Sequence, residues 1–421
     1  MTNGGKAAAQ WHRAVPVGGL LFATMFFSTW GSGMQKLSPV DLSKIFPLLA
    51  AIVIAYAALF ARKKAVFPRA FNWFAAFYVL HMVLTYTVFF PEELQFGFTG
   101  SSTRGADFVV RSEGAGIACS RIALFMAFGY AFAALLWEPR RLRLAALGYG
   151  AGLLAVLALG GYVSTEVTRA SAEVRNAGGF LDPNSFGFSG LTAIVLAMLA
   201  WTEAGRDARL KAALCGAAAV GGLAVLQSGS RASMMGCLFA LVTFMVLTDK
   251  LSRKVNILVA GALVGIVAFA FMPGAMLESL KERASIGRIR ADRGANRLDI
   301  WSNYLAEAPS YIVAGAGVLR AKEVIRGSYT AEFAITHNQY LELLVETGLA
   351  GFALFMLALA RLWRAARAAA GPANRLLSPV LLAGLVALFT EFMFLNCFYS
   401  RDTWILFGAV AGLAHHRRFH G

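Results

Sequence analysis

Long apolar runs recur along this 421-residue chain and constrain its fold more than any other feature. The runs measure about 16 to 24 residues, and a helix that rises about 1.5 Å per residue needs that length to cross about 30 Å of hydrocarbon. Because 58% of the residues are hydrophobic, 15% are charged and the mean hydropathy is +0.61, the composition suits lipid as the main solvent. The sequence therefore predicts an all-α polytopic membrane protein, with residues 1–421 as a single integral membrane domain. We expect about twelve transmembrane helices, near residues 15–35, 44–61, 71–90, 115–137, 145–164, 186–203, 212–227, 232–248, 255–272, 338–360, 377–395 and 403–416.

Basic residues mark every second connection between the predicted spans. These basic segments are Arg62 to Lys64, Arg140 to Arg143, Arg206 to Lys211, Lys250 to Lys254, Arg361 to Arg375, and Arg417 with Arg418. Lys and Arg concentrate in cytoplasmic loops of membrane proteins, so we expect both termini in the cytoplasm. The net charge of +16 then reflects topology and contact with the lipid bilayer, and nucleic acid is not an expected partner.

The opposite face carries the longest polar segment, residues 273–336, which is inserted before the last three predicted spans. Four arginines fall within ten positions of this loop, namely Arg288, Arg290, Arg293 and Arg297. Guanidinium groups bind phosphate and other anions through paired hydrogen bonds, so this density favours an anionic ligand. A solvated basic patch is the alternative that the sequence leaves open.

A short helix is expected within the loop. Asn296 is suited to cap it, the apolar pattern around Trp301 continues it, and Pro309 enforces its end. Arg297 then lies in the first turn, where free backbone amides also bind phosphate well. The start of this helix is therefore a candidate anion site.

Two further arginines are predicted near the same face. Arg231 lies in the very short turn Ser228-Gly-Ser-Arg231, so it is held close to the membrane surface. Arg121 lies inside the fourth predicted span, where an unpaired charge is costly. It is expected either to bind ligand or to form an ion pair, for which Glu391 is one candidate partner.

His337 and Asn338 open the tenth predicted span, directly after the arginine-rich loop. An imidazole titrates near neutral pH and can take a proton from a hydroxyl, while nearby arginines hold an anion. The segment that starts at Asp182, before the sixth span, is expected to form a turn and helix cap that could also line the site. His337 is thus the candidate for acid–base chemistry.

Metal and nucleotide cofactors are not expected. The four cysteines form no pair with zinc-ligand spacing, and no closely spaced aspartates suggest a divalent metal beside a nucleotide sugar. Gly315-Ala-Gly317 lacks the strand and helix context of a dinucleotide site. The four thiols are expected to be free and buried.

Four short motifs together resemble the bacterial O-antigen ligase and polymerase superfamily. They are Ser228-x-Ser-Arg231, Asn296-Arg297-x-x-x-Trp301, Pro309 followed by Gly315-x-Gly317, and His337-Asn-x-Tyr-Leu-x-x-Leu-x-x-x-Gly348. The similarity in layout covers almost the whole chain. One dominant external loop before the histidine motif, and no extra soluble domain, resembles the ligase branch most.

The resemblance implies a GT-C-like glycosyltransferase of the bacterial inner membrane that acts in lipopolysaccharide assembly. It would transfer an O-antigen glycan from undecaprenyl pyrophosphate to the lipid A-core on the periplasmic side, with inversion and without metal or nucleotide. His337 would be the general base, with Glu342 or Glu346 as alternatives. The implied substrate-binding residues are Arg288, Arg231, Arg297, Arg121, Asn338, Arg290 and Arg293. A polymerase that uses a lipid-linked glycan as acceptor, and a twelve-helix transporter, are the alternative functions.

Overall fold

The computed structural model places a helix in each of the twelve predicted spans. The described residues are 17–30, 45–61, 67–93, 115–136, 138–159, 163–168, 171–176, 182–270, 274, 277–278, 281, 297–325, 335–369 and 375–420. The twelve helices are α2 (Val17–Ser28), α3 (Ile45–Phe60), α4 (Arg69–Leu84), α5 (Ala115–Leu135), α6 (Pro139–Ala158), α7 (Pro183–Thr202), α8 (Ala208–Ser228), α9 (Arg231–Leu247), α10 (Leu251–Ala270), α16 (Gln339–Ala368), α17 (Leu377–Phe394) and α18 (Arg401–His420).

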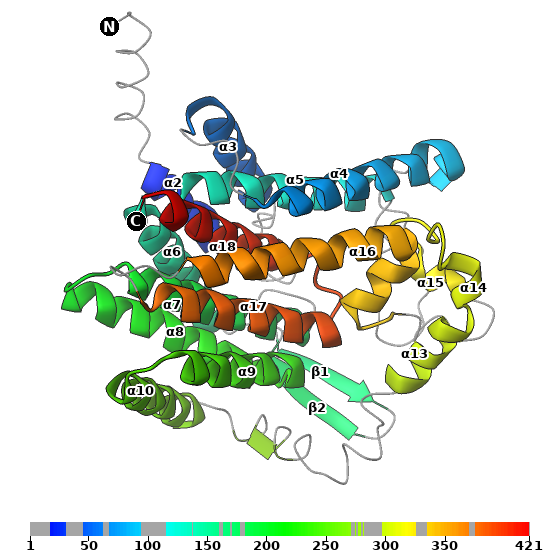
Figure 1. Ribbon diagram of the computed structural model, residues 1–421. Helices are drawn as coiled ribbons and strands as arrows, with labels where there is room; N and C mark the ends of the chain where they lie inside the picture. Colours follow the sequence, from blue (N-terminus) through cyan, green and yellow to red (C-terminus); the bar gives the residue numbers. More distant parts are fainter. Residues whose placement is uncertain are drawn as a thin grey trace, which may run out of the picture.

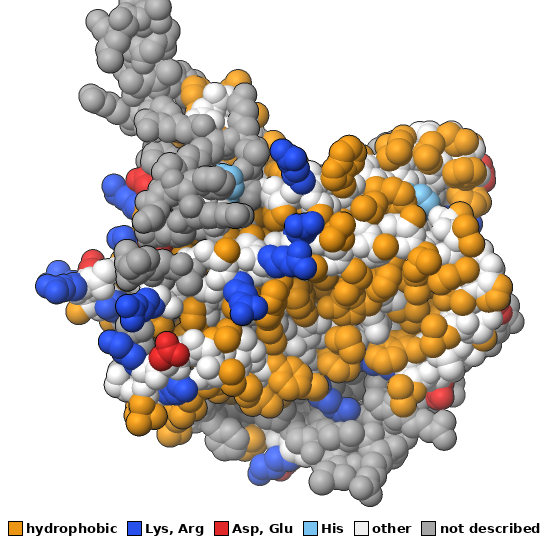
Figure 2. Space-filling model, viewed as in Figure 1, with side chains coloured by type: hydrophobic (Ala, Val, Ile, Leu, Met, Phe, Trp, Pro, Cys, Tyr) orange, Lys and Arg blue, Asp and Glu red, His pale blue; other side chains and the backbone are white. Residues whose placement is uncertain are grey.

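Seven helices in the described ranges are long and apolar enough to cross a membrane. They are α5, α6, α7, α8, α16, α17, and α4 together with the π-helical turn η3 (Thr85–Phe89) that extends it. The helices form one bundle (Figure 1), and apolar side chains gather over the middle of its visible face (Figure 2). The all-α polytopic membrane fold is therefore confirmed, whereas the number of spans stays a prediction.

Small residues let neighbouring helices approach closely. Gly190 on α7 faces Gly221 on α8, and a Cβ added to either glycine would lie 2.5 Å from the carbonyl oxygen of the other. In lipid, helix association depends on such close packing rather than on burial from water. The glycine- and alanine-rich composition of α8 thus builds its contact with α7.

A short β-hairpin is an exception to the helical fold. Strand β1 (Val163–Thr168) pairs antiparallel with β2 (Ser171–Asn176), with Val163 opposite Asn176 and Thr168 opposite Ser171. β-Branched residues are frequent in β1 and favour the extended backbone. The predicted span 145–164 is shifted accordingly, because α6 starts at Pro139, a favourable first helical residue, and ends at Ala158.

The described part of the predicted loop contains three short helices, α13 (Arg297–Ala306), α14 (Ala308–Tyr311) and α15 (Ala321–Val324). They lie at the end of the bundle opposite the C-terminus (Figure 1). Their small core is shared with the start of α16 and contains Ile300, Tyr304, Tyr311, Ala321, Ile325, Leu341 and Val345. The Tyr311 hydroxyl also donates a 2.6 Å hydrogen bond to the Tyr304 carbonyl. This layer is therefore packed on the segment that follows His337.

Helix α16 occupies the predicted span 338–360 and is interrupted at one residue, Gly348. Gly348 has φ 64° and ψ −172°, a conformation that glycine adopts readily and other residues do not. At this break the segment that follows α14 packs against α16. In this segment the Gly317 amide donates a hydrogen bond to the Glu346 carbonyl at 3.0 Å. The amide of Leu349 donates to the Ile312 carbonyl at 2.8 Å. The short helical layer is thereby joined to the membrane bundle.

Replacing Gly348 by alanine is expected to destabilise the protein by about 1–3 kcal/mol, because of the positive φ. The added Cβ would also lie 2.5 Å from the Val313 carbonyl oxygen. The melting temperature of protein in lipid nanodiscs measures the effect. Gly216→Ala in α8 is the matched control, because a Cβ there meets nothing within 4 Å. Equal melting temperatures of the two variants would contradict this account of the break.

Candidate functional site

His337 lies directly before α16, in a backbone that is fixed on both sides. Its φ of 46° is in the left-handed region, which is uncommon for residues other than glycine. On one side, the Asn338 side-chain oxygen accepts hydrogen bonds from the Tyr340 and Leu341 amides at 3.0 and 3.1 Å, which caps α16. On the other side, the Thr336 carbonyl accepts a bond from the Trp301 indole at 2.8 Å. The contact of Asn338 with substrate stays a prediction.

The indole bond explains the spacing of Asn296-Arg297-x-x-x-Trp301. Residues four apart lie on the same face of a helix, so Arg297 and Trp301 are neighbours on α13. Because Trp301 ties α13 to Thr336, Arg297 is close enough to His337 for its charge to act on the imidazole. The structure thus brings together the arginine and the histidine that the sequence singled out.

The His337 imidazole has a pKa below its ordinary value of 6.5. Burial is the largest cause, since it disfavours the charged ring, and the Arg297 guanidinium lowers the pKa further. The Asp182 carboxylate acts in the opposite direction. At neutral pH the ring is therefore mostly uncharged, which is the form that can accept a proton.

Two acids belong to the same neighbourhood. Glu391, on the last turns of α17, is fully buried, and both Arg297 and Asp182 are close enough to act on its charge. The Arg297 guanidinium also lies over the Phe394 ring, 5.6 Å from its centroid. Asp182 caps α7, where its carboxylate accepts from the Asn184 amide at 3.1 Å, as the sequence predicted. Four parts of the chain therefore lie close together: the start of α7, the start of α13, His337 before the cap of α16, and the end of α17.

Arg231 is the first residue of α9, at the same end of the bundle. Its turn is ordered by serines: the Ser230 amide donates to the Ser228 hydroxyl at 3.1 Å, and the Ser230 hydroxyl accepts from the Ser233 amide at 3.4 Å. Ser233 in turn lies beside Glu391. Arg231 therefore enters the neighbourhood of Glu391 from α9, which packs along α17.

Arg121 does not pair with Glu391, so that suggestion is wrong. Arg121 is exposed on α5, and among the charges of the described residues it acts on Arg401, the first residue of α18. Neither carboxylate oxygen of Glu391 has a hydrogen-bond partner among the described residues. The role of Arg121 in substrate binding stays a prediction. The other three arginines of the loop, Arg288, Arg290 and Arg293, lie outside the described residues.

The place of Glu391 in this site was not predicted from the sequence. The sequence feature that could have indicated it is an acid near the outer end of an apolar run, because ionisable residues at such depth usually face a polar site or a partner.

The expectation of buried thiols is only partly met, since Cys397 is buried but Cys215 is exposed. All four cysteines are free.

Replacing Trp301 by phenylalanine keeps the ring but removes the bond to the Thr336 carbonyl. We expect about a 5-fold lower turnover, because the loss of about 1 kcal/mol loosens Arg297 and His337 relative to each other. Steady-state kinetics measure this change in turnover. Trp363→Phe, at the other end of the bundle, is the control, and equal rates for both variants would contradict the proposed tether.

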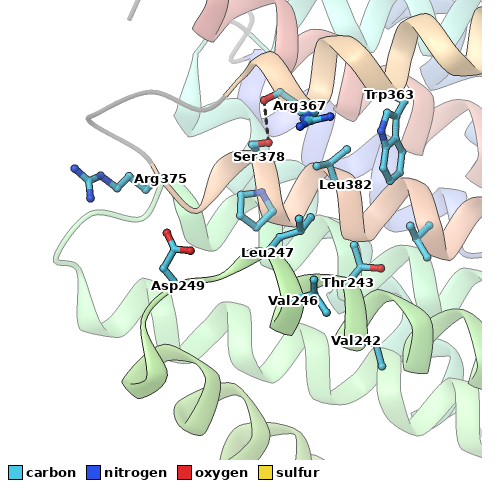
Figure 3. Close-up of a pocket in the computed structure, with 12 residues that line it drawn as sticks. Val242, Thr243, Val246, Leu247, Asp249, Trp363, Arg367, Arg375, Ser378 and Leu382 are labelled. Atoms are coloured by element: carbon cyan, nitrogen blue, oxygen red, sulfur yellow. Dashed lines mark hydrogen bonds between the residues drawn. The ribbon is translucent and has the colours of Figure 1, made fainter.

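An open groove lies at the end of the bundle where α16 ends, and none of the residues described around His337 lines it. It lies between the ends of α9 and α16 and the start of α17 (Figure 3). Its walls are mostly apolar, with Arg367, Arg375 and Asp249 at one side and a 3.2 Å bond from the Ser378 hydroxyl to the Arg367 carbonyl. The groove is therefore separate from the site around His337.

Comparison with known proteins identifies one family. Residues 216–356 match the family model described as O-antigen ligase. No curated protein matches the chain. The matched region runs from α8 into α16 and contains Arg231, Arg297, Trp301, His337 and Gly348. Over this region, about a third of the chain, the protein is similar to the O-antigen ligase family.

Proposed function

We propose that this protein transfers an O-antigen glycan from undecaprenyl pyrophosphate to a sugar of the lipid A-core. The observation that carries the proposal is the neutral His337 imidazole beside Arg297, held together by the Trp301 bond. A base for a hydroxyl and a cation for a phosphate are the two groups that such a transfer needs. The similarity of residues 216–356 to the O-antigen ligase family supports lipid-linked glycans as the substrate class.

In the proposed mechanism, His337 takes the proton of the acceptor hydroxyl. The hydroxyl oxygen attacks the anomeric carbon, the bond from that carbon to the pyrophosphate oxygen breaks, and the pyrophosphate leaves with the electron pair. Arg297 and Arg231 stabilise the charge that develops on it, together with Arg288, Arg290 and Arg293 of the same loop. Direct displacement inverts the anomeric configuration. Arg121 and Asn338 are proposed as further substrate contacts.

The proposed site faces the periplasm of a bacterial inner membrane, with both termini in the cytoplasm. Lys and Arg gather toward the end of the bundle that carries the C-terminus (Figure 2), and they include the basic residues at the start of α6 and the end of α16. The short helices and the start of α16, which His337 precedes in the chain, lie at the opposite end (Figure 1). The positive-inside rule then supports a periplasmic site.

A polymerase remains the second candidate, because the family match supports either an O-antigen ligase or a polymerase. Its acceptor would be a second lipid-linked glycan, with the same base and the same leaving group. The choice between ligase and polymerase depends on the acceptor.

The test is to incubate purified protein with a lipid pyrophosphate-linked glycan and lipid A-core, with chelator and without nucleotide. We expect glycan attached to the core. Longer lipid-linked chains, with no product on the core, would identify a polymerase. Movement of the glycan across a vesicle membrane without any new glycosidic bond would identify a transporter. Circular dichroism and a thermal melt show that the protein is folded in each case.

A further inference from the structure

The strained backbone at His337 requires neighbours that hold it. A residue other than glycine at φ 46° is strained and persists only where its surroundings fix it. Asn338 fixes the C-terminal side as the cap of α16. On the N-terminal side, Thr336 is fully buried and takes part in a cluster of polar side chains.

Thr336, Glu342 and Asn396 form this cluster, which we call the clamp. The Thr336 hydroxyl lies 2.5 Å from Glu342 Oε2 and 2.9 Å from Asn396 Oδ1, and the Asn396 amide donates to Glu342 Oε2 at 3.0 Å. The three residues come from the segment before α16, from α16 itself and from the loop after α17. The clamp therefore joins the His337 backbone to two elements of the bundle.

Counting hydrogens shows which form of Glu342 the clamp needs. The Thr336 hydroxyl has one hydrogen but faces three acceptors. The two closest are the carboxyl of Glu342 and the amide oxygen of Asn396, and the third is the Asn338 carbonyl at 3.3 Å. With an ionised Glu342, one of these close oxygen pairs has no hydrogen between its atoms. If Glu342 carries a proton, it donates to Thr336, Thr336 donates to Asn396, and Asn396 donates back to Glu342.

The alternative orientation of the Asn396 amide leads to the same result. Exchanging its oxygen and nitrogen places the amide oxygen 3.0 Å from Glu342 Oε2, and that contact again needs a hydrogen on the carboxyl. Two other charged side chains are near. Lys322 on α15 acts on Glu342, and Glu346 lies one turn further along α16. The Glu346 carboxyl accepts from the Leu319 amide at 2.7 Å and bonds the Tyr399 hydroxyl.

We propose that Glu342 is a positioning residue in its neutral acid form, which holds His337 in its strained conformation through Thr336. It donates a hydrogen bond and takes no proton from substrate. This inference rests on the proposed function for its effect on catalysis. The clamp itself is a property of the folded chain and can be measured without substrate.

The test compares Glu342→Gln with Glu342→Ala in the full-length protein in nanodiscs. The glutamine amide can donate to Thr336 as the neutral acid does, and it can also donate to Asn396 once the Asn396 amide turns over to present its oxygen. We therefore expect turnover within about 3-fold of wild type. Alanine removes the clamp and is expected to lower kcat about 10- to 100-fold with little change in KM, because misplacement of the base affects the chemical step. Hydrogen–deuterium exchange of residues 335–341 should rise in the alanine variant alone. Glu323→Ala on α15 is the control, with wild-type rate and exchange.

Each outcome decides the inference. A glutamine variant as slow as the alanine variant, with normal exchange protection, would show that Glu342 works as an acid or base and would overturn the proposal. Unchanged exchange in the alanine variant would also overturn it. If wild type forms no glycosidic bond, the proposed function fails, but the exchange measurements still decide whether the clamp holds the His337 segment.

Discussion

Replacing His337 by alanine is expected to slow glycan transfer about 100- to 10,000-fold, the usual contribution of a positioned general base. The KM for the lipid-linked donor should change little, because in the proposed mechanism the arginines and not the imidazole hold the pyrophosphate. Initial rates of product formation with both substrates saturating measure the effect. His415→Ala, on α18 toward the other end of the bundle, is the matched control and should keep the wild-type rate.

The pH dependence provides a second measure of the same residue. A base works only when unprotonated, so the rate should fall as pH falls through the pKa of His337. Since burial and Arg297 hold that pKa below 6.5, the rate of wild type should reach half of its maximum at a pH below 6.5. A His337→Ala variant with the wild-type rate, or a rate independent of pH down to pH 4, would exclude His337 as the base.

The helices could be predicted from the sequence because lipid requires a continuous apolar run in every span. The break at Gly348 could not, since hydropathy does not report backbone dihedral angles. Its cause is the segment around Gly317, whose amide bonds with the Glu346 carbonyl only in the folded protein. The hairpin that starts at Val163 was missed for a similar reason, because its pairing with residues of β2 is a contact between segments.

The candidate site was predictable where its residues are close in sequence. The spacing of Arg297 and Trp301 follows from one turn of helix, and His337 stands at the start of an apolar run. Contacts between distant elements were not predictable. Asn396 is 60 residues from Thr336, and only the packing of the last three spans brings it to the clamp. The suggested pairing of Arg121 with Glu391 was wrong because hydropathy predicts how far along a span a residue lies, but not which neighbouring helix it faces.

Replacing Arg297 by alanine is expected to lower kcat/KM for the lipid-linked donor about 100-fold, because its charge stabilises the leaving pyrophosphate. Lysine should recover only part of this loss, since one ammonium group cannot form the paired hydrogen bonds of a guanidinium. The same alanine variant should show its acidic loss of rate at higher pH than wild type, because removing the positive charge raises the pKa of His337.

Arg320→Ala is the matched control for Arg297, since each guanidinium lies over an aromatic ring in the same region. Arg320 lies 3.5 Å from the centroid of the Phe90 ring, and Arg297 lies 5.6 Å from that of Phe394. Loss of ring packing alone would slow both variants equally and would leave the pH profile unchanged. A selective loss in Arg297→Ala, accompanied by the shift of the acidic limb, requires the charge of Arg297 to act on both donor and base. That joint effect separates an arginine of the active site from one that only stabilises the short helical layer.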